Sequence, residues 1–253
     1  MLKIIYLSIV QGLTEFLPIS SSGHLRIFHQ ILEFYDNFLF LDVVLHFGTL
    51  LAILLCFHKK IFFIFNEIFK NKNWRYLFLI IVACTPAFFA GMFLKEILSQ
   101  FFSLKIVGIC FIITAIVLFF ANISGGDKEI KDLSLFDSFK IGVMQALAIL
   151  PGISRSGFTL SGGLFCGLKK EEAFDFSFIL AIPVILGASL FEGVFNFSLL
   201  LTNLPIYMVG LITSFVFGII GIYLFRVLVK NSKLWIFSIY LILLSILVFA
   251  DVV

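Results

Sequence analysis

Charged residues are scarce in this 253-residue chain: they make up 13% of it, against about 25% in an ordinary soluble domain. Hydrophobic residues make up 61%. This balance excludes a soluble globular protein and predicts an integral membrane protein. At ~20 residues for each span, the length allows roughly six to eight spans with short loops, and it leaves no room for a domain outside the membrane.

Cysteine is also scarce, and its four copies show no ligand-like spacing. They stand in separate apolar runs, at Cys56, Cys84, Cys110 and Cys166. This spacing favours small apolar side chains that fill space over disulfides or a metal centre. The net charge is only +3 and comes from lysines between the apolar runs, so we expect no nucleic-acid partner.

Long hydrophobic runs are what the chain has in abundance. Six of them are long enough to cross a bilayer: Leu39–Phe57, Tyr76–Leu94, Leu104–Ile123, Phe174–Phe197, Ile206–Phe225 and Leu234–Ala250. Two other segments, residues 4–34 and 135–168, are interrupted midway by proline, glycine and serine, and their halves are too short to span. Such segments are typical of re-entrant helix-loop-helix hairpins, whose freed backbone groups must be satisfied by protein or by a water-filled cavity.

The expected fold is therefore an all-α polytopic membrane protein, a single domain over residues 1–253. It has about six transmembrane helices and two re-entrant hairpins. The basic residues between the runs fall on one side if every run crosses: Lys59, Lys60, Lys70, Lys72 and Arg75 in one loop, then Lys128, Lys131, Lys169, Lys170, Arg226, Lys230 and Lys233. By the positive-inside rule this side is the cytoplasm. Both termini and the connections Lys95–Ser103 and Asn196–Pro205 then face outward.

The two broken segments share a sequence pattern. Gln11–Gly23 and Gln145–Gly157 align without a gap and agree at Q-x-L-x5-I-S-x-S-G. With the topology above, the first hairpin enters the membrane from outside and the second from the cytoplasm. The agreement then indicates an inverted-topology repeat, in which broken helices meet near the midplane and form a polar site. Chance similarity between two Ser/Gly-rich loops is the alternative.

The two copies differ at their ionisable residues. Glu15 and His24 occur only in the first copy, and Arg155 only in the second, where the first has Ser21. Superposed copies would place an acid, an imidazole and a guanidinium around one cavity. Because charge is costly inside a membrane, these residues are functional candidates. A structural ion pair between Glu15 and Arg155 is the competing explanation.

Hydroxyl groups and glycines surround these ionisable groups. The set comprises Ser20, Ser21, Ser22, Gly23, Ser154, Ser156, Gly157 and Thr159. Small residues let backbone amides approach an anion, and a helix N-terminus points donors at it. Arg155 adds a planar fork that matches phosphate oxygens. The pattern predicts a phosphate site, although such loops also permit close helix packing in lipid.

The first hairpin offers groups for catalysis and for a cation. Gln11 and Glu15 are four residues apart and share a helix face, where their oxygens could bind a hard divalent cation, Mg²⁺ or Ca²⁺. His24 could be a nucleophile or general acid, and Ser21 a nucleophile with Glu15 or His24 as its base. We expect Glu15 and His24 to act as one unit. Asp42 and His46, also four residues apart, could face the cavity or hydrogen-bond another helix, and we expect the structural role.

Both motifs resemble those of the undecaprenyl-diphosphatase family, also called the bacitracin-resistance protein family. "QGLTEFLPISSSGHL" carries its [E/Q]-x-x-x-E and S-S-[S/T]-G-H elements, and "LPGISRSGFTLSGG" carries its P-G-x-S-R-S-G element. The likeness covers nearly the whole chain, including the number and spacing of spans. Gln11 stands where many members have glutamate, which removes one negative charge from any metal site.

The resemblance implies a multi-pass enzyme of the bacterial inner membrane that recycles a cell-wall lipid carrier. It would hydrolyse undecaprenyl diphosphate to the monophosphate and inorganic phosphate, at a site open to the periplasm. Glu15, His24 and Arg155 would carry activity; Ser21, Ser154, Ser156 and Thr159 would contact phosphate. The partners would be the lipid substrate and the bilayer, with a homodimer left open. A transporter or lipid flippase is the alternative, since inverted repeats with broken helices are typical of transporters.

Overall fold

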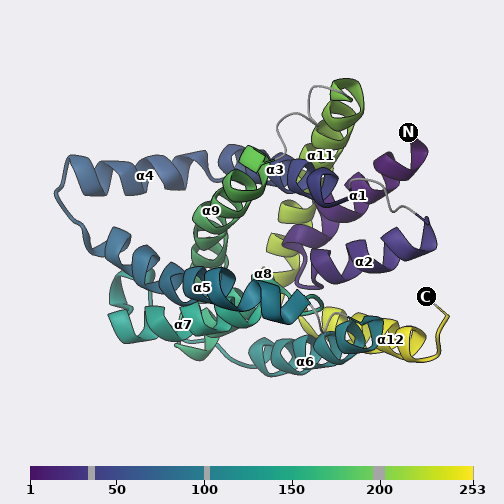
Figure 1. Ribbon diagram of the computed structural model, residues 1–253. Coiled ribbons are helices and arrows are strands. Elements are labelled where there is room, and N and C mark those ends of the chain that lie inside the picture. Colours follow the sequence, from purple (N-terminus) through teal and green to yellow (C-terminus); the bar gives the residue numbers. More distant parts are fainter. Residues whose placement is uncertain (34–37, 100–102, 196–202, 253) are drawn as a thin grey trace.

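The computed structural model describes residues 1–33, 38–99, 103–195 and 203–252. Their regular secondary structure is helical, apart from one isolated β-bridge between Lys128 and Leu168, and short turns and loops join the helices. Along the chain the elements are α1 (Leu2–Phe16), α2 (Ser21–Ile31), α3 (Phe38–Cys56), α4 (His58–Phe69), α5 (Arg75–Ser99), α6 (Leu104–Asn122), the 3₁₀ turn η1 (Ile130–Asp132), α7 (Leu135–Leu147), α8 (Arg155–Phe165), α9 (Lys170–Phe195), α11 (Leu204–Lys230) and α12 (Trp235–Phe249). In Figure 1, α5, α6, α7 and α12 lie together below α1, α2 and α3, with α9 running between the two groups.

Each of the six predicted apolar runs corresponds to a helix. Among the described residues, α5, α6, α9 and α11 are long and apolar enough to cross a membrane by themselves. A fifth candidate is α3 joined to α4, although the pair is bent by 71°. The sixth run forms α12, which is apolar but only 15 residues long. The predicted connections at 95–103 and 196–205 include residues 100–102 and 196–202, which lie outside the described residues.

The segment from Lys59 to Arg75 was expected to be a loop, and this was wrong for most of its length. His58–Phe69 form α4, with Ile64 and Ile68 buried against the main hydrophobic core. In the sequence, lysines that follow an apolar run resemble the end of a membrane span. Here they belong to an amphipathic helix that turns away from α3.

Both broken segments consist of two short helices with a break at the predicted place. The first break follows α1, where Leu17 is extended (ψ 141°) because a residue before proline avoids the helical conformation. The second break contains Gly152 at a φ of 98°, a conformation in which a side chain is strained. The caps that restart the helices are equivalent: Ser20 accepts a hydrogen bond from Gly23 N, and Ser154 accepts one from Gly157 N.

Small residues let the broken helices pack closely on long ones. A Cβ at Gly12 of α1 would lie 2.8 Å from Ser214 O of α11, and one at Gly142 of α7 would lie 2.5 Å from Ala83 O of α5. In a bilayer such backbone approach is a main source of helix association. This packing holds α1 against α11 and α7 against α5, and it therefore fixes where the two breaks lie in space.

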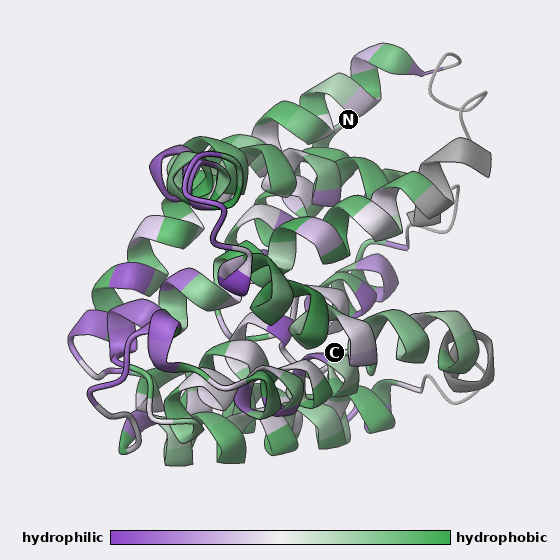
Figure 2. Ribbon diagram, turned by 90° about the vertical axis from the view of Figure 1, so that its left-hand side faces the viewer, coloured by the Kyte–Doolittle hydropathy of each residue, from purple (hydrophilic) through white to green (hydrophobic). Residues whose placement is uncertain are grey.

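Hydrophilic groups gather at one end of the molecule, along the left side of Figure 2. Ion pairs join basic residues from different connections there: Lys60–Asp175 at 3.2 Å, Arg226–Asp175 at 3.4 Å, Lys169–Glu129 at 3.0 Å and Lys128–Asp137 at 3.7 Å. The segments after α3, α6, α8 and α11 therefore lie on a common face. We call this face the basic end.

Candidate active site

The centre of the candidate site is the carboxylate of Glu15, in the last turn of α1. Its side chain is buried, and its Oε1 pairs with Nη2 of Arg155, the first residue of α8. Its Oε2 accepts hydrogen bonds from Ser21 Oγ at 2.6 Å and from Gln11 Nε2 at 3.1 Å. Glu15 therefore joins residues from both hairpins, and the structural ion pair considered from the sequence is present.

His46 of α3 is a fourth neighbour of this carboxylate. Its Nε2 lies 3.5 Å from Glu15 Oε2, and its Nδ1 faces the backbone oxygen of Asp42 at 2.7 Å. Because a carbonyl can only accept, Nδ1 carries the hydrogen. The Asp42 side chain makes the expected structural contact, with His29 of α2 at 3.1 Å. His46 instead faces the candidate site, the alternative that the sequence left open.

His24 occupies a separate environment. It is 3% exposed, with Nδ1 2.8 Å from Ser20 O and Nε2 2.7 Å from the hydroxyl of Tyr240. Its ring also packs on Phe111. Within the described residues no hydrogen bond or ion pair joins His24 to Glu15, although their partners Ser20 and Ser21 are adjacent; that the two residues act as one unit stays a prediction. Tyr240 was missed because it stands in an apolar run 216 residues away.

Two hydrogen bonds, each between a backbone group and a serine side chain, join the two breaks. Gly152 N donates to Ser20 Oγ at 3.0 Å, and Ser156 Oγ donates to Leu17 O at 3.3 Å. A Cβ at Gly23 would lie 2.7 Å from the ring of Phe111, so glycine is required where the breaks meet. Close packing, one of the two explanations that the sequence left open, is therefore present at Gly23.

The hydroxyls of the second hairpin form hydrogen bonds with other groups of the protein. Ser154, Ser156 and Thr159 are buried, and Thr159 Oγ1 shares a 2.5 Å hydrogen bond with Ser177 of α9. Thr114 of α6 accepts from Ser154 N. This network fixes the start of α8, and with it Arg155.

On the first hairpin Ser20 is also buried, but the next two hydroxyls are more accessible. Ser21 is half-buried and Ser22 is exposed. The side chain of Arg155 is 14% exposed and that of His46 is 30% exposed. The groups best placed to meet a ligand are thus Ser21, Ser22, Arg155 and His46.

Two oxygen donors could serve a cation. Gln11 Oε1 is buried and has no hydrogen-bond partner in the described part of the chain, and it lies beside the Glu15 carboxylate. Across the same residues, no group of three or more His, Cys, Asp or Glu side chains has metal-binding geometry. The chemistry of these two oxygens fits a hard cation that takes its other ligands from phosphate and water. They do not form a closed site by themselves.

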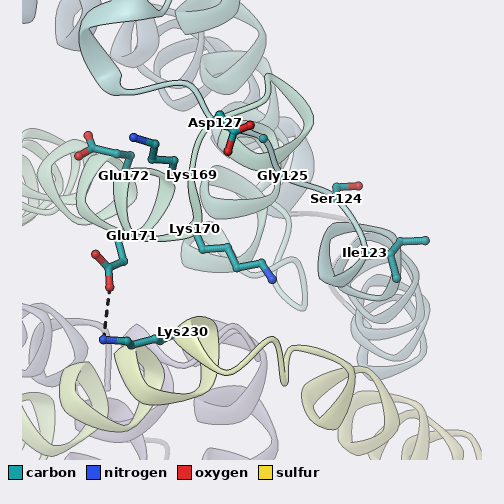
Figure 3. A pocket seen from close by; sticks show the side chains of 10 residues that line it. Ile123, Ser124, Gly125, Asp127, Lys169, Lys170, Glu171, Glu172 and Lys230 are labelled. Atoms are coloured by element: carbon teal, nitrogen blue, oxygen red, sulfur yellow. Dashed lines mark ion pairs between the residues drawn. The ribbon is translucent and has the colours of Figure 1, made fainter.

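A cavity of about 710 Å³ lies elsewhere, at the basic end (Figure 3). It is lined mainly by residues of mixed charge: Asp127, Lys169, Lys170, Glu171, Glu172 and Lys230. Glu171 pairs with Lys230 across it at 3.7 Å. None of the candidate site residues lines this cavity, and its charges balance, so it does not have the character of a diphosphate site.

The fold and the Glu15 cluster define a multi-pass helical membrane protein with a polar site between two broken helix pairs. The chain belongs to the bacitracin resistance protein BacA family, whose family model matches residues 4–247. The membership expected from the two motifs is confirmed.

Relatives of similar length share about two-fifths of the sequence. The chain is 41% identical over 257 residues to the undecaprenyl-diphosphatase of Alkaliphilus metalliredigens (strain QYMF), covering 94% of each chain. It is 42% identical over 248 residues to that of Thermosipho melanesiensis, covering 97% of each. With the undecaprenyl-diphosphatase of Methanococcus maripaludis the identity is 40% over 247 residues, covering 96% of each.

Proposed function

We propose that this protein hydrolyses undecaprenyl diphosphate to undecaprenyl phosphate and inorganic phosphate, which would return the lipid carrier to cell-wall synthesis. The observation that carries the proposal is the Glu15 cluster, which unites an acid, a hydroxyl and a guanidinium from two hairpins. The names of the relatives supply the substrate. Apolar helix faces around the cluster suit a polyprenyl tail, and the cluster itself suits the diphosphate.

Arg155 is the group best suited to bind the terminal phosphate. Its guanidinium matches two phosphate oxygens in one plane. Without substrate it pairs with Glu15, so an arriving phosphate competes with that carboxylate. Binding of phosphate would thereby weaken the pair between Arg155 and Glu15.

Ser21 and Glu15 have the arrangement of a nucleophile and its base. The Ser21 hydroxyl donates to Glu15 Oε2 at 2.6 Å, within the reach required for proton transfer. In the proposed step, Ser21 Oγ attacks the terminal phosphorus, Glu15 takes the hydroxyl proton, and the bond to the bridging oxygen breaks as undecaprenyl phosphate leaves. Water then hydrolyses the phosphoserine. Attack by water in place of Ser21 would use the same base.

A divalent cation, Mg²⁺ or Ca²⁺, fits this site as a proposed cofactor. The Glu15 carboxylate and Gln11 Oε1 would hold it, and substrate phosphate would supply further oxygens. When bound, it would offset the negative charge of the diphosphate. The glutamine at position 11 gives this chain one carboxylate fewer than a site with glutamate there.

We further propose that the two hairpins are re-entrant and form an inverted-topology repeat. The equivalent caps at Ser20 and Ser154 support the repeat. The basic end supports a cytoplasmic position for the segments after α3, α6, α8 and α11. The site would then open to the periplasmic face of the plasma membrane.

A phosphate-release assay on detergent-purified protein tests the proposal. We expect phosphate from undecaprenyl diphosphate, loss of release in Glu15→Gln, and loss on addition of a chelator that excess Mg²⁺ reverses. A lipid flippase would instead move fluorescent lipid between leaflets of vesicles without releasing phosphate. Light scattering on the same sample distinguishes a monomer from a homodimer.

A further inference from the structure

The helix α4 has a surface that neither the fold nor the proposed hydrolysis uses. It follows α3 after a bend of 71° and lies at the basic end, where Lys60 near its start pairs with Asp175 of α9. Ile64 and Ile68 attach one side of α4 to the core. No other described part of the chain buries the opposite side, where Lys59 and Phe62 are exposed.

Next to the buried side, α4 exposes a stripe of aromatic rings. Phe62, Phe65 and Phe69 are spaced three and four residues apart, so they share one helix face. Their exposed fractions are 63%, 54% and 61%. The rings of Phe65 and Phe69 are 4.4 Å apart, and Trp74 packs edge-on against Phe69. This continuous apolar surface requires a partner.

Beyond the aromatic stripe the helix carries basic residues together with Phe63, a further ring that is 51% exposed. At 100° per residue, Lys59 and Asn66 flank the stripe on the side away from Ile64. Lys70 and Lys72 follow the helix and are exposed. Glu67 is the only acidic residue between positions 58 and 75, and its two oxygens accept from the amides of Asn71 and Asn73. The basic side therefore carries an excess of positive charge.

We propose that α4 lies flat in the interface of the membrane leaflet at the basic end and binds anionic phospholipid headgroups there. The stripe of Phe62, Phe65 and Phe69 enters the upper acyl chains. Lys59, Lys70 and Lys72 contact lipid phosphates. An apolar face beside a lysine-rich face is the pattern of interfacial helices, and an exposed Trp74 suits the headgroup level.

Charge favours lipid over a second copy of the chain as the occupant of this surface. In a two-fold dimer through α4, the same basic residues would face one another across the interface. An anionic leaflet neutralises them instead, and one lysine at such a surface changes binding by about fivefold. The inference does not depend on the proposed hydrolysis.

Trp74 provides the probe for this binding. The chain has two tryptophans, so Trp235→Phe leaves Trp74 as the only one, and Trp74→Phe gives the background from Trp235. Both full-length variants are reconstituted in vesicles of phosphatidylcholine containing phosphatidylglycerol, with bromine on one lipid or the other. Bromine at shallow or deep acyl positions then reports depth.

We expect shallow bromine to quench Trp74 more than deep bromine does, and brominated phosphatidylglycerol to quench it more than brominated phosphatidylcholine at equal mole fraction. The variant K59Q/K70Q/K72Q in the Trp235→Phe background should reduce this lipid preference about tenfold or more. Lys3→Gln and Lys105→Gln, at the first turns of α1 and α6, serve as controls and should leave it unchanged.

Three outcomes would overturn the proposal. Equal quenching by the two lipids would mean that α4 does not select anionic headgroups. Quenching by aqueous iodide in place of lipid would place the stripe in water. Disulfide-linked dimers formed by a Phe65→Cys variant, with no lipid quenching, would assign the surface to a second copy of the chain.

Discussion

Replacing Arg155 by lysine changes the shape of the cation while it keeps the charge. In the structure the guanidinium pairs with the Glu15 carboxylate, and its side chain is 14% exposed. Its position is fixed because Thr159 Oγ1 donates to Arg155 O at 2.8 Å and shares a hydrogen bond with Ser177. An ammonium can neutralise the same charges but cannot present two coplanar donors.

The expected loss follows from one missing charge-assisted hydrogen bond. Such a bond contributes about 1.5–3 kcal/mol, and every 1.4 kcal/mol is about tenfold. We therefore expect kcat/KM for undecaprenyl diphosphate to fall roughly ten- to a hundredfold in Arg155→Lys. The thermal unfolding midpoint should change little, since a cation still lies beside Glu15.

The assay is phosphate release by purified protein at equal concentration of folded enzyme. Arg226→Lys is the matched control, because Arg226 also pairs with a carboxylate, that of Asp175, at 3.4 Å but at the basic end. The control should keep kcat/KM within about twofold, as expected of an exposed ion pair. If Arg155→Lys turned over as fast as the wild type, two-point contact with phosphate would be refuted.

Three further predictions concern the residues around Arg155. Because no hydrogen bond or ion pair links Glu15 to His24 among the described residues, losses in kcat for Glu15→Gln and His24→Ala should multiply in the double variant. A double variant no worse than the more damaged single variant would instead support the shared unit expected from the sequence. His46→Leu should lower kcat about tenfold because Glu15 loses one partner, and His46→Gln should restore it. An unchanged kcat in His46→Leu would show that the 3.5 Å contact does not contribute to catalysis. Gly152→Ala places a Cβ 2.6 Å from Val107 O at a φ of 98°, so the free energy of unfolding in detergent should fall by about 1–3 kcal/mol from backbone strain alone, which lowers the unfolding midpoint. Gly187→Ala, which meets nothing within 4 Å, is the control and should melt like the wild type.

The membrane class and the position of both breaks were predictable because each rests on local sequence. Apolar runs report span length directly, and proline and glycine interrupt a helix wherever they occur. The breaks near Leu17 and Gly152 follow from residues within a few positions. That Glu15 and Arg155 lie together was also predicted, because two copies of one pattern would bring their ionisable residues around one cavity; their direct ion pair was the competing explanation.

Some local features were misjudged because one pattern had two explanations. Lys59 and Lys60 were taken as the end of a span, whereas they begin an amphipathic helix in which Ile64 and Ile68 are buried. The segment is basic, as predicted, but most of it forms a helix and not a loop. The helical periodicity covers only 12 residues, so the lysines outweighed it in the sequence prediction. The helix is held in place by the packing of its buried side chains against the core.

By itself the sequence determined that the protein lies in a membrane, where its helices and two broken segments fall, and that an acid and a guanidinium come together at Glu15. Only the tertiary structure decided which side chains complete the environment of each group. His46 lies beside Glu15, and Tyr240 faces His24, because α3 and α12 pack against the hairpins at particular rotations. A helix rotation moves a side chain by several ångströms without altering its apolar pattern, so residues 31 and 216 positions apart leave no local trace of their contact.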